Sequence, residues 1–153
     1  MGRKNSPSAN KELNELIAQY ETARAENRQL YLDGDQLADI ADQYAAGRKF
    51  NEAQEVITYG LHLHPDSTDL LVEQAYLYLD TGKIPLAKKV VESITDEYDT
   101  DVKMLKAELM LNEGQLENAR NVLDTIEDAD ELETIINIVY LYMDMGYPEA
   151  AKE

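Results

Sequence analysis

The hydrophobic residues of this chain recur every three or four positions, which is the period of an amphipathic α-helix. Residues 66–94 show the pattern clearly, because apolar side chains run at this spacing from Leu70 to Leu79 and resume after Gly82. The polar residues at 66–68 can cap a first helix, and Gly82 tolerates the positive φ at which that helix ends. Pro85 suits the first turn of a second helix, where its missing N–H is not needed. The segment therefore predicts a helical hairpin.

The same hairpin recurs at a nearly constant interval. Small residues form two columns and a mostly aromatic position forms a third, with spacings of 34, 32 and 32 residues in each. The columns are Ala41, Ala75, Ala107 and Val139; Ala53, Ala87, Ala119 and Ala151; and Tyr44, Tyr78, Met110 and Tyr142. Gly82, Gly114 and Gly146 precede the second column by five residues, whereas Gly47 is displaced by one. We expect the small residues to let paired helices approach closely and the third column to pack in the core.

A repeat of about 34 residues with this order of small, aromatic, glycine and alanine positions resembles the tetratricopeptide repeat family. Residues 34–67 (GDQLADIADQYAAGRKFNEAQEVITYGLHLHPDS) match at Ala41, Tyr44, Ala53 and Pro65. The resemblance covers roughly residues 34–153 and implies an all-α fold, a right-handed superhelical solenoid of antiparallel helix pairs. It places repeats at about 34–67, 68–99 and 100–131, with a truncated repeat at 132–153.

The chain departs from the family pattern in two ways. The second and third repeats are two residues shorter than the first and lack its closing proline. Lys103 and Lys106 stand where the family prefers apolar residues, while Val102, Leu105 and Leu109 carry the apolar stripe of that helix. We expect the helix to form, whereas these departures leave its exact rotation open.

The segment before the repeats predicts one more amphipathic helix, within residues 10–33. Its apolar positions are Leu13, Leu16, Ile17, Tyr20, Ala23, Leu30 and Tyr31. We interpret it as a cap on the first hairpin, because a terminal repeat needs a polar outer face; a partner-binding or dimerising helix is the alternative. Residues 1–9 have no apolar core and are interpreted as a disordered basic tail rather than a secretory signal.

The C-terminal segment begins a fourth hairpin whose second helix is cut short. Repeat units cannot bury their apolar faces alone, so this end needs cover from further repeats or from another copy. We expect self-association through the apolar residues of this segment, which include Ile135, Ile136, Ile138, Val139 and Tyr142.

The resemblance also implies a binding surface, since the first helices of this family line a concave groove. The equivalent groove positions here are Asp42, Tyr76, Glu108 and Tyr140. Val72 and Met104 form one neighbouring row and Leu79 and Leu111 another, while Asp80 adds negative charge along the same helices. Such a groove is apolar and aromatic in the middle and acidic at its edges, which suits a basic and apolar peptide or helix. Alternatively, missing repeats or a second copy only shield these residues. The clamp that some family members use for a chaperone tail is absent, because Ala38 and Asp42 occupy its places.

The charge of the chain restricts its partners. It carries 31 acids against 14 bases among 153 residues, a net charge of −17. Such a surface repels phosphate backbones and anionic lipids, so we expect neither nucleic acid nor membrane as a partner. The absence of cysteine removes thiol catalysis and thiolate zinc sites and fits a cytoplasmic protein.

Few residues of the chain are candidates for catalysis or metal binding. The only histidines, His62 and His64, are two apart, and on one helix they would point about 200° from each other. We interpret them as imidazoles favoured at a helix C-terminus; a weak surface zinc site with Asp66 and Asp69 is the alternative. The stretch DTGK at 80–83 lacks the upstream glycine of a phosphate loop. We therefore expect no enzyme activity and no cofactor, and interpret the chain as a protein–protein interaction scaffold or, alternatively, a self-assembling structural module.

Overall fold

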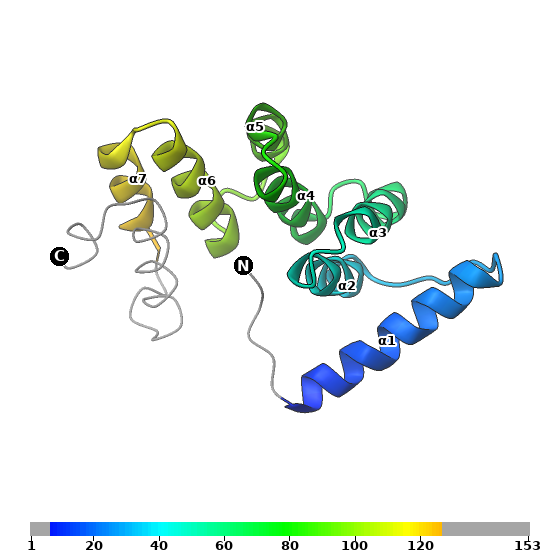
Figure 1. Cartoon of the computed structure of the whole chain (residues 1–153). Helices are drawn as coiled ribbons and strands as arrows, with labels where there is room; N and C mark the ends of the chain where they lie inside the picture. The colour runs from blue at the N-terminus through cyan, green and yellow to red at the C-terminus, as the bar shows by residue number, and fades with distance from the viewer. Residues whose placement is uncertain (1–6, 127–153) are drawn as a thin grey trace. The chain divides into compact units, whose positions relative to one another are not determined.

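The computed structural model describes residues 7–126, where every regular element is an α-helix (Figure 1). The helices are α1 (Pro7–Ala25), α2 (Gly34–Ala46), α3 (Phe50–Leu63), α4 (Thr68–Asp80), α5 (Ile84–Ser93), α6 (Thr100–Asn112) and α7 (Leu116–Leu123). The chain forms two compact units, Met1–Lys83 and Ile84–Glu153. The predicted all-α class is confirmed. The apolar C-terminal segment from Ile135 to Tyr142 lies outside the described residues.

In the first unit, α2 and α3 pair and α4 packs against both (Figure 1). The core between them consists of fully buried aliphatic side chains, among them Leu37, Ile40, Val56, Ile57 and Leu70. The small-residue columns lie where predicted, because Ala41 and Ala53 are buried at the contact of the paired helices. Apolar burial of this kind is the main favourable contribution to folding.

Two contacts hold α4 in register on α3. Gly60 of α3 faces Leu70 of α4, and a Cβ added to Gly60 would lie 2.8 Å from Cδ1 of Leu70. The side-chain amides of Gln54 and Gln74 donate hydrogen bonds to each other, at 2.9 and 3.0 Å. Gln74 is only 6% exposed, so its amide needs this partner. A shift of α4 by one residue would break both contacts.

The turns that follow α2, α4 and α6 have the same backbone hydrogen bonding. The amides of Lys49, Lys83 and Gln115 donate to the carbonyls of Tyr44, Tyr78 and Met110, at 2.8, 2.7 and 2.8 Å. The residue just before each donor has positive φ: 60° at Arg48, 77° at Gly82 and 77° at Gly114. The displaced Gly47 instead has an ordinary φ of −86°. The residues with positive φ therefore follow the repeat spacing in all three turns, even though the glycine of the first of these turns is displaced by one position.

The segment before the repeats is shorter as a helix than predicted. α1 ends at Ala25, and Asn27 adopts a φ of 55° while the amide of Arg28 donates to the carbonyl of Ala23 at 2.8 Å. Asparagine tolerates this left-handed conformation, and the bond from Arg28 closes the helix end. Leu30 and Tyr31 thus belong to a non-helical linker, although their spacing continues the helical period.

The beginning of α1 also differs from the sequence prediction. The helix begins at Pro7, inside the predicted tail of residues 1–9, because proline is compatible with a first helical turn. α1 packs on the first helix pair through Tyr20, which is 5% exposed and belongs to that core. The hydroxyl of Tyr44 donates a 2.6 Å hydrogen bond to the Glu21 carboxylate. Burial, followed by this bond, raises the pKa of Tyr44 well above its ordinary value.

In the second unit, α6 packs against both α5 and α7. It accordingly buries residues around most of its circumference: Val102, Met104, Leu105, Ala107, Leu109 and Leu111. The apolar stripe predicted for this helix is confirmed. Lys103 and Lys106 are partly exposed, and the ammonium of Lys103 donates to the carbonyl of Thr125 at 2.9 Å.

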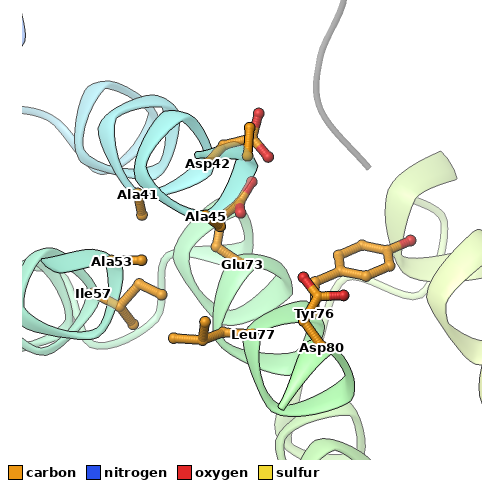
Figure 2. A pocket seen from close by; sticks show the side chains of 10 residues that line it. Ala41, Asp42, Ala45, Ala53, Ile57, Glu73, Tyr76, Leu77 and Asp80 are labelled. Carbon is orange, nitrogen blue, oxygen red and sulfur yellow. The ribbon is translucent and has the colours of Figure 1, made fainter. Parts of the chain in front are cut away.

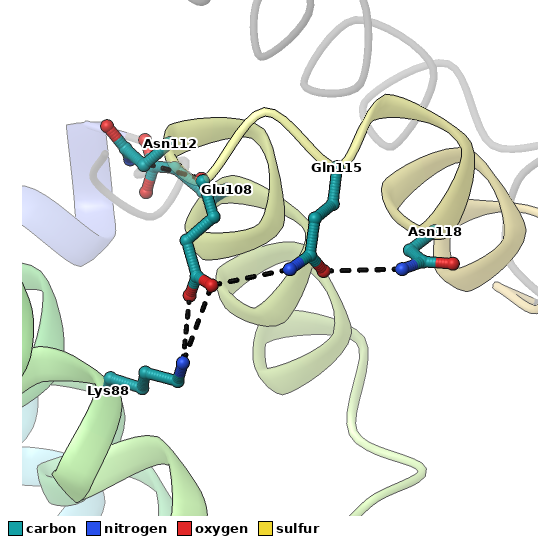
Figure 3. Close-up of polar contacts among 6 residues, drawn as sticks. Lys88, Glu108, Asn112, Gln115 and Asn118 are labelled. Carbon is teal, nitrogen blue, oxygen red and sulfur yellow. Dashed lines mark hydrogen bonds and ion pairs between the residues drawn. The ribbon is translucent and has the colours of Figure 1, made fainter.

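Polar contacts join the helix ends of the second unit (Figure 3). Lys88 of α5 forms an ion pair with Glu113 at 3.2 Å. The side-chain amide of Gln115 donates to Glu113 at 3.4 Å, and that of Asn118 donates to Gln115 at 3.3 Å. These contacts are exposed, so each contributes little to stability.

Candidate partner-binding surface

Side chains of α2, α3 and α4 enclose a small acidic pocket in the first unit. Its volume is about 60 Å³, and Ala41, Ala53, Ile57 and Leu77 form its apolar floor. Asp42 of α2 and Glu73, Tyr76 and Asp80 of α4 stand around the opening, with Ala45 beside them (Figure 2). Ala46 also lines the pocket. We call this site, by its four polar residues, the acidic pocket.

The local helix geometry explains why these side chains meet. Glu73, Tyr76 and Asp80 are spaced by three and four residues, so they share one face of α4. The packing of α4 against α2 brings Asp42 beside that face. Three of the sequence-predicted residues, Asp42, Tyr76 and Asp80, are thereby collected in one place. Glu73 was not predicted, although its position three residues before Tyr76 could have indicated it.

The other sequence-predicted groove residues lie elsewhere. Val72, Met104 and Leu111 are buried at 5%, 5% and 3% exposure, so a partner cannot reach their side chains without a rearrangement. Leu79 and Glu108 are partly buried on α4 and α6, and neither lines the acidic pocket. Tyr140 lies outside the described residues, as do the residues predicted for self-association.

The size and charge of the acidic pocket limit what it can hold. Small-molecule sites usually have volumes of about 300–1,000 Å³, whereas the volume of the acidic pocket is only about 60 Å³. The lining contributes three carboxylates and no cationic side chain. Across residues 7–126, no group of histidine or acidic side chains is arranged to hold a metal ion. The pocket therefore has the dimensions for the end of one cationic side chain.

The histidines occupy different environments at the end of α3. His62 is exposed in the last turn, while His64 is the partly buried C-cap residue. Nε2 of His64 donates to the carbonyl of Leu32 at 2.8 Å, and the Tyr31 ring packs edge-on against the imidazole at 5.4 Å. His64 thus fastens the linker after α1 to the end of α3, a structural role that the repeat pattern could not show.

Comparison with known protein families identifies the repeat. Residues 44–109, from the end of α2 into α6, match the family described as tetratricopeptide repeat. The match supports a tetratricopeptide repeat assignment for these residues. No curated protein and no solved structure gives a significant match. Tetratricopeptide repeats generally mediate protein–protein interaction, and proteins that carry them are typically non-catalytic scaffolds.

The family match covers most of the acidic pocket. Glu73, Tyr76 and Asp80 lie within the matched residues, and Asp42 lies two positions before the match begins at residue 44. None of the helices between residues 7 and 126 combines the length and apolar character that a bilayer span requires.

Proposed function

We propose that this protein is a tetratricopeptide repeat protein and binds a basic and apolar segment of a partner protein through the face formed by α2 and α4, without catalysis. The observation that carries the proposal is the acidic pocket, where three carboxylates surround an apolar floor. In this family the first helices of successive repeats line the binding groove, and the repeat spacing assigns α2 and α4 to that role. The cytoplasm, suggested by the absence of cysteine, is the proposed location.

Lysine is the side chain that fits the acidic pocket best. Its four-carbon stem can lie on Ala45 and Leu77 while the ammonium faces the carboxylates. The ring of Tyr76 stands beside the opening and offers a further surface for the cation. An ammonium is a compact point charge, whereas a guanidinium is a larger planar group. We therefore expect lysine to be preferred over arginine at this position of the partner.

The net charge of the chain adds a long-range attraction for any basic segment. A chain with a net charge of −17 attracts basic segments and accelerates their association, and added salt reduces the effect. Individual exposed ion pairs contribute only about 0–1 kcal/mol, so useful affinity requires several contacts. Leu79 and Glu108 are proposed as such additional contacts. Tyr140, which lies outside the described residues, stays a predicted partner contact.

The proposal is tested with a synthetic peptide of alternating lysine and leucine, compared with its glutamate–leucine counterpart by isothermal titration calorimetry. Only the lysine peptide is expected to bind, more weakly as salt is raised. Asp42→Lys should abolish binding, because it places an ammonium at the pocket. Asp66→Lys is the matched control: Asp66 is exposed, lies outside the pocket and changes the net charge equally. Equal losses in both variants would show that only overall charge matters and would refute the pocket.

Self-association remains a second candidate function. It rests on the apolar run from Ile135 to Tyr142 in the sequence, because repeat units need a neighbour to cover such faces. Light scattering at micromolar concentrations should give a mass above that of one chain. A monomeric mass over this range would contradict the prediction.

A further inference from the structure

A second, larger cavity of the first unit lies between the end of α1, the linker that follows it and α3. Its volume is about 340 Å³, which falls within the range of small-molecule sites. Its wall includes the rings of Tyr20 and Tyr59, packed at a tilt with centroids 6.3 Å apart, together with Ala23 and Leu30. This linker cavity therefore has one apolar, largely aromatic side.

The polar residues of the linker cavity are hydrogen-bond donors. Arg24, Asn27, Arg28 and Gln29 line it, and no carboxylate does. In the whole chain acids outnumber bases by 31 to 14, so this lining has the opposite charge to the rest of the protein. Arginine presents a planar fork of donors that matches carboxylate and phosphate oxygens. The charge of the cavity selects an anion.

The donors are held in place before any ligand binds. The turn at Asn27 closes α1 and brings Arg28 and Gln29 back beside Arg24. The hydroxyl of Tyr59 then donates to the carbonyl of Leu30 at 2.7 Å, which fixes the linker on α3. The bond from His64 to the Leu32 carbonyl fixes it again two residues later. Preorganisation of this kind lowers the entropic cost of binding.

One polar group of the cavity residues is unpaired. Tyr20 is 5% exposed, and its hydroxyl is buried without a hydrogen-bond partner in the described part of the chain. Burial raises the pKa of Tyr20, so the hydroxyl keeps its proton and remains a donor at neutral pH. Buried polar groups are rarely left unpaired. A small rearrangement of the ring would offer this donor to an anion in the cavity.

We propose that the linker cavity binds an organic oxyanion, a carboxylate or phosphate group joined to an apolar or aromatic body. The oxyanion faces Arg24 and Arg28, and the body packs on Tyr20 and Tyr59. This function goes beyond partner binding at the acidic pocket, because it uses other residues and a ligand of the opposite charge.

The existing ion pairs of the two arginines do not block this site. Arg24 contacts Glu55 at 2.8 Å and Arg28 contacts Glu26 at 2.6 Å, and all four side chains are at least half exposed. Exposed pairs of this kind are weak. A ligand oxyanion can therefore take the place of the glutamates, which act as competitors of the ligand.

Calorimetric titration of the full chain at low salt tests the proposal with four probes: N-acetylphenylalanine, phenyl phosphate, inorganic phosphate and the neutral N-acetylphenylalaninamide. At least one of the first two should bind, and the stronger of them identifies the preferred oxyanion. The amide should not bind, and inorganic phosphate should bind more weakly than phenyl phosphate. Binding of the amide with equal affinity would overturn the proposal, as would the absence of binding by both aromatic anions.

Matched variants locate the site. Arg24→Gln or Arg28→Gln should weaken binding about fivefold or more, because a charge-assisted hydrogen bond is lost. Glu26→Gln and Glu55→Gln should strengthen it, since each removes a competitor. Lys11→Gln is the control on α1, an exposed residue outside the cavity with the same change in charge. A loss with Lys11→Gln equal to that with Arg24→Gln would overturn the assignment, provided circular dichroism shows all variants folded.

Discussion

Arg48, in the turn between α2 and α3, has a left-handed backbone conformation and offers a test of how the repeat geometry is maintained. Arg48 stands where the later repeats have Gly82 and Gly114, and it has the same positive φ. We predict that Arg48→Gly is more stable than Arg48→Ala. Both variants lose the contact of the Arg48 guanidinium with the Phe50 ring, 5.4 Å from its centroid, so this loss cancels in the comparison.

The magnitude follows from two opposing effects. A left-handed conformation costs an L-residue about 1–2 kcal/mol relative to glycine, while the greater freedom of glycine in the unfolded chain costs about 0.5–1 kcal/mol. The glycine variant should therefore exceed the alanine variant by about 0.5–1 kcal/mol. At Gly47, where φ is −86° and an added Cβ lies 3.6 Å from its nearest neighbour, alanine should instead stabilise by about 0.4–1 kcal/mol.

Urea unfolding followed by circular dichroism measures both differences, from the shift in midpoint at a common slope. The decisive result is the opposite sign at neighbouring positions: alanine is favoured over glycine at 47 and disfavoured at 48. If alanine is favoured at both positions, the strain argument is refuted, because glycine at the left-handed position would bring no advantage.

Three further predictions concern the packing of the first unit. Gly60→Ala should destabilise by about 1 kcal/mol in thermal unfolding, because a Cβ 2.8 Å from Cδ1 of Leu70 overpacks the contact by about 1–3 kcal/mol and exceeds the gain in helix propensity of about 1 kcal/mol; a more stable variant would contradict this. Gln54→Ala should cost about 1–3 kcal/mol by leaving the buried amide of Gln74 unpaired. In a double-mutant cycle, additive costs of changing both glutamines to leucine would argue against the pair. Because burial raises the pKa of Tyr44 above its value of 10.0 in the unfolded chain, its contribution is complete below that pH and is lost above it. Urea unfolding at pH 9 and 11 should accordingly show a smaller decline for Tyr44→Phe, and an equal decline would count against the assignment.

The recurring columns predicted the contacts between paired helices well. Ala41 and Ala53 are buried where the column spacing placed them, because small residues at a helix contact leave a strong sequence signal. The end of α1 was not predictable in this way. Leu30 and Tyr31 continue the apolar period, whereas the turn at Asn27 depends on a backbone conformation that periodicity does not report.

The candidate sites show the same division. Asp42, Tyr76 and Asp80 were found from the repeat, since equivalent helix positions face the same way. Glu73 was not predicted, because only equivalent positions of successive repeats were compared. Residues that lie on the same helix face as those positions were not considered. The linker cavity could not be predicted from the repeat pattern, since most of its residues belong to a segment that occurs once in the chain. They come together only through the turn after α1.

The paired amides of Gln54 and Gln74 bear on how this array can evolve. The repeat spacing aligns these two positions with Lys88 and Lys106, which line a cavity of about 350 Å³ between α5 and α6. One junction is thus joined by complementary amides, and the next has two like charges at the same places. A gene duplication or recombination that exchanged one repeat for another would set a glutamine opposite a lysine. The residues at each junction therefore fit only one order of the repeats. A chain with its repeats in another order would need compensating changes at these positions.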